Sequence, residues 1–229
     1  MYENLKKRVY EANMMLPKSG LVKFTWGNVS ERDLETGHIA IKPSGVEYEA
    51  LTPEDMVVLD LDGNIIEGKL NPSSDTKTHI EIYKAFPEIN GIVHTHSTYA
   101  TSWAQSGRNI PSYGTTHADY MYGEIPCLRN LTKEEIDEDY EKNTGVLIVD
   151  FMKDKESSKI PAIILKNHGP FVWGKDCFDA VHNAVVLEEV AKMAMFTEMI
   201  NKSATETPIE VQDKHYYRKH GAGAYYGQK

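Results

Sequence analysis

The first 20 residues carry apolar side chains at helical spacing. Leu5, Val9, Ala12 and Leu16 recur every three or four positions, and the pattern stops at Pro17. This spacing predicts a surface helix. Short apolar or β-branched segments follow, separated by turn sequences such as ETG, KPSG and DGN. They predict antiparallel strands at residues 21–26, 38–42, 56–61 and 64–68.

The next stretch alternates helical and strand patterns. Residues 73–86 begin with candidate capping side chains and stop before Pro87, which predicts a helix of about three turns. The segment GIVHTH at 91–96 predicts a strand, and residues 97–107 predict a second helix that ends at a glycine. Thr132 and Glu135 then form a capping-box pattern, which predicts an acidic helix to about residue 143. No element is predicted for residues 146–160.

The last third contains two strands and a long helix. The segment IPAIIL at 160–165 has the composition of a buried strand, and a turn separates it from a second strand at 171–174. Asp176 is a candidate cap for a helix with one apolar stripe. The final thirty residues are rich in Tyr, His and Lys and show no periodicity. Strands joined by short turns and flanked by helices predict one α/β domain over residues 1–229, with a largely antiparallel sheet and helices on both faces.

Composition narrows the function classes. The formal net charge is -9, with 25 basic against 34 acidic residues, which argues against binding to nucleic acid or to an anionic membrane. No apolar run approaches the roughly 20 residues of a membrane helix, and the N-terminus does not resemble a secretion signal. Two cysteines, Cys127 and Cys177, form no disulfide framework. We therefore expect a cytoplasmic protein.

Two histidines, His94 and His96, stand out in the strand at 91–96. Residues two apart on a strand point to the same face, so the two imidazoles form a pincer. Metal binding and simple hydrogen bonding to the backbone remain equally open for this pair alone. Three other histidines, His38, His79 and His182, are predicted at surface positions.

Two further residues add to this chemistry. His168 lies in a Gly-Pro turn after the strand at 160–165, which is where α/β proteins place functional residues. Asp75 begins the helix at 73–86, and capping is the commoner role for such a carboxylate. Three histidines and one carboxylate would suit zinc or a similar divalent ion, although no spacing rule unites them.

Several turns are candidate anion sites. Ser73 and Ser74 stand at a helix N-terminus, which favours either phosphate binding or plain capping. Other turns supply the remaining candidates, namely Gly27, Asn28, Lys42, Ser44 and Gly45. The segment GAGAYYG near the C-terminus lacks the strand, the helix and the spacing of a dinucleotide loop, so a nicotinamide site is excluded.

Eight motifs in order resemble one enzyme family. They are TWGNVS, IKPSGV, PSSDTKTH, GIVHTHS, GTTHADY, NHGPFVWGK, VHNAVVLEEVA and HYYRKHGAGAYYGQ. Together they resemble the L-ribulose-5-phosphate 4-epimerases of the class II aldolase and adducin-head superfamily. This resemblance implies a sugar-phosphate substrate, a cyclic homotetramer with interface sites, and a divalent ion, usually zinc, with manganese or cobalt as alternatives.

The resemblance also assigns roles to residues. Asp75, His94, His96 and His168 match the metal ligands of the family, and Gly27, Asn28, Ser44, Gly45, Ser73 and Ser74 match its substrate- and phosphate-binding positions. Asp119 matches one catalytic acid/base. Tyr226 matches the other and is donated by a neighbouring subunit through the tail at 205–229. His215, from the same tail, resembles a catalytic helper.

The chemistry of the implied reaction requires such parts. Carbon 4 of L-ribulose 5-phosphate is not acidified by the ketone, so its inversion needs either transient oxidation or cleavage of the bond between carbons 3 and 4. Oxidation would need the nicotinamide site that is excluded above, which leaves cleavage and re-formation of this bond. A metal stabilises the enediolate fragment as a Lewis acid, and two acid/bases on opposite sides move the proton.

A class II aldolase such as L-fuculose-1-phosphate aldolase is the alternative, although that branch typically has Glu at the position of Asp75. A scaffold like the adducin head is disfavoured by the complete ligand set. Arabinose and ascorbate breakdown would both need this epimerisation.

Overall fold

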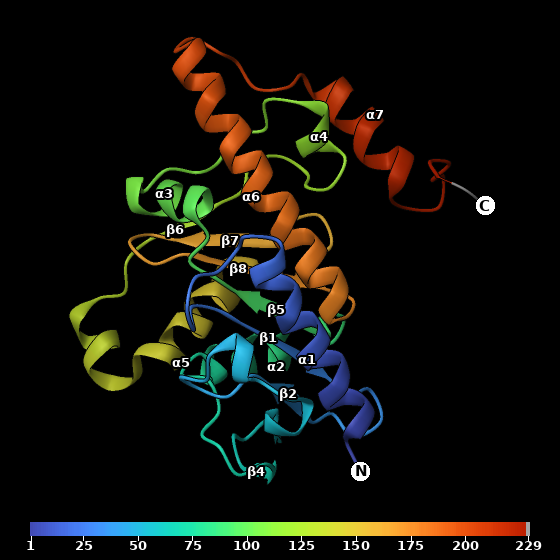
Figure 1. Cartoon of the computed structure of the whole chain (residues 1–229). Coiled ribbons are helices and arrows are strands. Elements are labelled where there is room, and N and C mark those ends of the chain that lie inside the picture. Colours follow the sequence, from blue (N-terminus) through green and yellow to red (C-terminus); the bar gives the residue numbers. More distant parts are fainter. Residues whose placement is uncertain (228–229) are drawn as a thin grey trace.

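Eight strands form a single sheet in the order β4-β3-β2-β1-β5-β8-β7-β6 (Figure 1). The computed structural model describes residues 1–227. Its strands are β1 (Asn28–Arg32), β2 (Ile39–Ile41), β3 (Val57–Leu59), β4 (Ile65–Glu67), β5 (Gly91–His94), β6 (Cys127–Leu128), β7 (Ala162–Leu165) and β8 (Pro170–Gly174). Neighbouring strands pair antiparallel, apart from β6 and β7. The predicted single α/β domain with a mostly antiparallel sheet is therefore confirmed.

All five predicted helices are present among residues 1–227. The helices are α1 (Glu3–Lys18), α2 (Thr76–Ala85), α3 (Thr98–Ser106), α4 (Thr115–Ala118), α5 (Lys133–Met152), α6 (Cys177–Ile200) and α7 (Ile209–Lys219), with short 3-10 turns η1 (Tyr48–Ala50) and η2 (Pro53–Asp55). Of these, α4 and α7 are additional to the predicted helices. Two predicted caps are present, since Asp176 accepts a bond from the backbone of Asp179, and Thr132 accepts one from Glu135, whereas α2 and α3 begin without a capping side-chain bond. In this part of the chain, no helix combines the length and the apolar character needed to cross a bilayer.

Two large hydrophobic clusters join helices to the sheet. One contains Val93 of β5 with apolar residues of α1, α3 and α6. The other contains the adjacent Ile92 with residues of α2 and α5. Alternate strand residues thus reach different clusters. At the β4 edge, Ile65 and Ile66 are 50% and 45% exposed. The prediction that helices flank both faces of the sheet is therefore not confirmed at this edge.

The strand predicted at residues 21–26 is wrong, because this segment is a loop. Phe24 has a φ of +50° and is 71% exposed, and Gly27 has a φ of +104°. Such left-handed conformations interrupt a strand. Pairing starts instead at Asn28 and continues through the polar segment NVSER. Ser30 is fully buried there, with its hydroxyl 2.7 Å from His79 Nδ1 and 2.8 Å from the Tyr83 hydroxyl.

Three segments without a predicted element are α-helical, namely α4, the end of α5 and α7. Helix α5 continues past residue 146 to Met152, with a break at Asp139 where φ is -164°. Gly145 allows its close contact with α2, since a Cβ there would lie 2.7 Å from the Glu81 side chain. Helix α7 occupies the tail, and its buried residues, Gln212 and Tyr216, both hydrogen-bond elsewhere in the chain. Because this inner face is polar, α7 leaves no apolar stripe in the sequence.

Candidate metal centre

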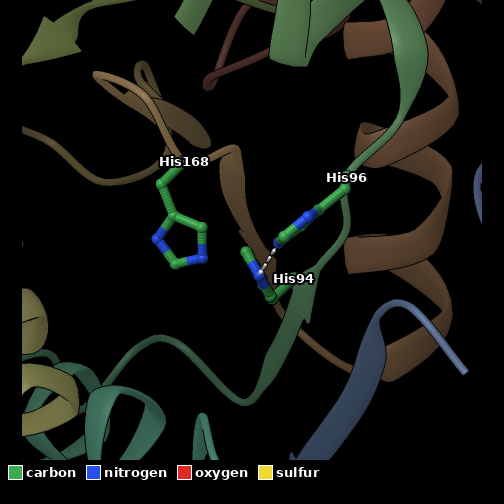
Figure 2. A group of neighbouring side chains, drawn as sticks. All are labelled: His94, His96 and His168. Carbon is green, nitrogen blue, oxygen red and sulfur yellow. Dashed lines mark hydrogen bonds between the residues drawn. The ribbon is translucent and has the colours of Figure 1, made fainter. Parts of the chain in front are cut away.

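Three histidines converge near the middle of the sheet (Figure 2). His94 ends β5, His96 follows it, and His168 comes from the turn between β7 and β8. Each offers one ring nitrogen, and these atoms lie within 4.8 Å of one another. The Nε2 atoms of His94 and His96 are 3.1 Å apart. Two nitrogens on one tetrahedral zinc, with bonds of about 2.0 Å, would be roughly 3.3 Å apart. The cluster therefore fits a divalent ion.

Neighbouring groups orient the His94 ring. Its Nδ1 lies 2.9 Å from the Pro170 carbonyl oxygen, which can only accept, so Nδ1 carries the proton and Nε2 presents its lone pair to the cluster. The Phe171 ring stacks on the same imidazole with centroids 4.2 Å apart. Phe171 pairs with His94 across β5 and β8, so the sheet register produces this support.

The turn before β8 places His168. Asn167 adopts a φ of +61°, and the backbone nitrogen of Leu165 donates to Gly169 across the turn at 2.9 Å. The Tyr140 hydroxyl lies 3.4 Å from His168 Nδ1. Burial and the neighbouring His94 and His96 lower the pKa of His168 to about 3. His168 is therefore neutral near pH 7, which is the form that binds metal.

The surface position predicted for His79 is wrong. Its side chain is fully buried on α2, one turn after Asp75. Burial lowers the pKa of His79 to about 3. Its buried Nε2 has no hydrogen-bond partner among the described residues, while its Nδ1 contacts Ser30. Ser30 of the polar strand β1 therefore makes a buried contact with His79, a residue that the sequence pattern had placed at the surface.

Asp75 lies at the N-cap position of α2 but makes no capping hydrogen bond with its side chain. Its Oδ2 instead accepts a bond from Asn28 Nδ2 at 2.7 Å. Burial acts to raise the pKa of Asp75, but nearby histidines and the Asn28 bond outweigh it, so the net shift is downward. Asp75 does not belong to the group of three converging histidines, but it lines the same cleft.

The cleft around this cluster has a volume of about 320 Å³. Its walls include Gly27, Asn28, Lys42, Ser44, Gly45, Ser73, Ser74, Asp75, His94, His96 and His168, which are the residues predicted for metal and substrate. Backbone bonds join the two loops that carry Ser44 and Ser73, because Ser73 N donates to the Lys42 carbonyl at 3.0 Å and Ser44 N to the Asn71 carbonyl at 2.9 Å. Eleven predicted residues from distant segments thus share one cavity.

Gly27 and Lys42 lie where the chain packs closely around the cleft. A Cβ at Gly27 would lie 2.8 Å from the His94 carbonyl oxygen, so only glycine fits beside the strand there. Lys42 is 2% exposed, and its ammonium donates to the Val46 carbonyl at 2.7 Å and lies 4.9 Å from the Tyr48 ring centroid. Burial lowers the pKa of Lys42.

The predicted acid/bases lie elsewhere in the chain. Asp119, His215 and Tyr226 are absent from the lining of this cleft and come from the end of α4, from α7 and from the segment after α7. Figure 1 shows α4 and α7 side by side at one end of α6, away from β5. Asp119 Oδ1 accepts a bond from His215 Nδ1 at 3.0 Å, and Tyr226 is 62% exposed. One chain therefore holds two separate clusters.

Sequence reasoning missed several residues of the cleft. Thr25 and Trp26 come from the loop before β1, and Tyr140 and Glu141 come from α5. Trp26 lies inside the TWGN segment, which was a detectable signal. Tyr140 and Glu141 lie in an acidic helix without a functional motif, so only the packing of α5 on α2 reveals them.

Comparisons with known proteins agree with this fold. Residues 7–195 match the class II aldolase and adducin N-terminal domain family. One solved L-fuculose 1-phosphate aldolase is 25% identical, with a TM-score of 0.79 over 94% of this chain and 95% of its own. The enzyme of that name from Glaciozyma antarctica is 21% identical, with a TM-score of 0.78 over 97% of this chain and 84% of its own. The one from Thermus thermophilus is 24% identical, with a TM-score of 0.69 over 89% and 98%. The family match covers most of the chain, and the chain therefore belongs to the class II aldolase and adducin N-terminal domain family.

Proposed function

We propose that the chain is a metal-dependent L-ribulose-5-phosphate 4-epimerase, which forms D-xylulose 5-phosphate by cleaving and reforming the bond between carbons 3 and 4. The observation that carries the proposal is the pair of clusters. A histidine centre lies beside the serine loops, which carry Ser44, Ser73 and Ser74. A separate group contains Asp119 and Tyr226. A reaction that needs a Lewis acid, a phosphate site and two proton-transfer groups accounts for both clusters. The proposed setting is cytoplasmic sugar breakdown, such as arabinose catabolism.

The proposed metal ligands are His94, His96, His168 and Asp75. Three imidazoles and a carboxylate suit zinc, and manganese or cobalt also accept this donor set. When bound, the ion supplies Lewis-acid stabilisation of negative charge on the ketone-bearing fragment. The chain contributes orientation, because the Pro170 carbonyl and the Phe171 ring hold His94 in place.

The serine loops are the proposed phosphate site. Ser73 and Ser74 precede α2, whose N-terminus favours an anion, and Ser44 and Gly45 lie in the adjoining loop. Lys42 is proposed to add positive charge beneath them, and Gly27 and Asn28 to contact the substrate backbone. Together these groups would keep the cleaved phosphate fragment bound while its aldehyde turns to offer the opposite face.

Asp119 and Tyr226 are the proposed acid/bases, with His215 as a helper. We propose that they reach the cleft from a neighbouring subunit of a homotetramer, His215 and Tyr226 through the tail at 205–229 and Asp119 from the end of α4; residues 228 and 229 of the tail lie outside the described range. The arrangement within one chain supports this, since neither group lines the chain's own cleft. Because Arg218 contacts both Asp119 and Tyr226, the same neighbour is proposed to supply both.

An aldolase is the second candidate, supported by the structural similarity to proteins named L-fuculose 1-phosphate aldolase. Such an enzyme would use the same metal centre but release its fragments. The carboxylate at position 75 is Asp, whereas the resemblance gives Glu for the aldolase branch, which favours the epimerase.

The direct test is an assay of the metal-loaded protein with L-ribulose 5-phosphate. We expect D-xylulose 5-phosphate to form, measured by an enzyme coupled to that product, without accumulation of free dihydroxyacetone. An aldolase would instead cleave L-fuculose 1-phosphate to two free fragments and would leave L-ribulose 5-phosphate without epimerisation. That second outcome would replace the proposed function with the alternative.

A further inference from the structure

Arg218 joins the proposed acid/bases within one chain. Its guanidinium makes a two-point contact with Asp119, from Nε to Oδ1 at 2.9 Å and from Nη2 to Oδ2 at 2.7 Å. The same guanidinium carbon lies 4.9 Å from the centroid of the Tyr226 ring. The Arg218 carbonyl also accepts bonds from the backbone nitrogens of Tyr225 and Tyr226, at 2.9 and 3.0 Å. The side chain of Arg218 thus contacts both Asp119 and Tyr226, and its backbone carbonyl also binds the segment that carries Tyr226.

We propose that Arg218 is a positioning residue that holds Asp119 and Tyr226 as one preorganised proton-transfer unit. This inference rests on the proposed function and deepens it. A planar guanidinium fixes the plane of a carboxylate by two parallel bonds, and it stacks on an aromatic ring, whereas an ammonium does neither. Preorganisation matters because small displacements of a catalytic group cost large factors in rate.

Other groups around Asp119 share the charge but not the geometry. His215 donates to Oδ1, Lys219 Nζ lies 3.6 Å from Oδ2, and His220 Nε2 donates to the Asp119 carbonyl at 2.9 Å. Lys219 also lies 4.6 Å from the Tyr226 ring centroid. Burial acts to raise the pKa of Asp119, but the bonds from Arg218 and His215 and the charge of Lys219 lower it overall. Only Arg218 contacts both Oδ atoms of Asp119 among the described residues.

The kinetic test compares Arg218→Met and Arg218→Lys with Arg108→Met. Arg108 is a matched control, because it makes the same two-point contact with Glu198, at 2.7 and 2.6 Å, and lies 5.0 Å from the Trp103 ring centroid. We expect Arg218→Met to lower kcat about 100-fold with little change in KM, and to move the acidic limb of the pH profile to higher pH. Arg218→Lys should retain part of the rate, and Arg108→Met should match the wild type.

A second measurement does not depend on catalysis. Fluorotyrosine placed at position 226 reports the surroundings of that ring by ¹⁹F NMR in the metal-free full-length protein. We expect Arg218→Met to move this resonance towards its value in the unfolded chain, and Arg108→Met to leave it unchanged. An unshifted resonance in Arg218→Met, with wild-type kcat and pH profile, would overturn the inference. A shifted resonance in a protein that epimerises no L-ribulose 5-phosphate would keep Arg218 as the organiser and reject the proposed function.

Discussion

Exhaustive chelation is expected to lower epimerisation by at least about 1000-fold, since a Lewis acid contributes several kcal/mol to charge stabilisation in such reactions. Zinc, manganese or cobalt is expected to restore the activity. The reason lies in the three converging histidines, whose ring nitrogens fall within 4.8 Å of one another, with His94 oriented by the Pro170 carbonyl. Metal content by mass spectrometry and turnover of L-ribulose 5-phosphate are measured on the same samples.

A pair of variants separates the metal effect from damage by the chelator. His96→Asn removes one ring from the cluster and should reduce both metal content and turnover. His38→Asn is the control, because His38 is half-buried and contacts the Tyr2 hydroxyl away from the cleft. It should bind metal like the wild type. Full turnover by protein verified as metal-free would reject the mechanism.

Asp119→Asn is expected to slow epimerisation by about 100- to 10,000-fold, because an amide does not exchange a proton near neutral pH. Metal content should stay at the wild-type level, since Asp119 does not line the cleft of its own chain. The fold should also persist, because asparagine has nearly the same shape and its side-chain oxygen can still accept the bonds from His215 and Arg218. The measurements are kcat, metal content and near-UV circular dichroism.

Asp213→Asn is the matched control for this variant. Asp213 lies on α7, and its carboxylate accepts a bond from the Tyr122 hydroxyl at 2.5 Å, so it is another hydrogen-bonded acid of the same region. It should keep near-wild-type kcat. An Asp119→Asn protein with the same kcat as this control would remove Asp119 from the catalytic groups.

Much of the metal centre is predictable from local rules. The spacing of two predicted that His94 and His96 lie together, and their rings do meet, although β5 ends at His94 and His96 follows the strand. His168 follows a buried strand in a turn, which is a common place for site residues. The joining of these segments depends on the sheet order, in which β8 lies next to β5. Sequence periodicity does not reveal strand order, so only the family resemblance linked His168 to the other two.

Other features escaped prediction for physical reasons. Ser30 and His79 Nδ1 contact each other in the interior, so a polar pattern that normally indicates solvent marks a buried contact. Residues 21–26 are typical of a strand. The left-handed backbone at Gly27, which lies against the His94 carbonyl, overrides this strand propensity. Helix α7 packs through Gln212 and Tyr216, whose polar groups hide the helical period.

The central claim is that each active site combines the metal centre of one chain with Asp119 and Tyr226 of the next. Mixed oligomers test it most directly. In hybrids of Tyr226→Phe with His96→Asn chains, random assembly around a ring regenerates roughly a quarter of the sites, although each parent is nearly inactive. Asp119→Asn with His96→Asn should recover equally, whereas Asp119→Asn with Tyr226→Phe should recover nothing, because both changes fall on the same donated unit. If verified hybrids of Tyr226→Phe and His96→Asn stay at the parental level, Tyr226 does not act across subunits and the shared site is contradicted.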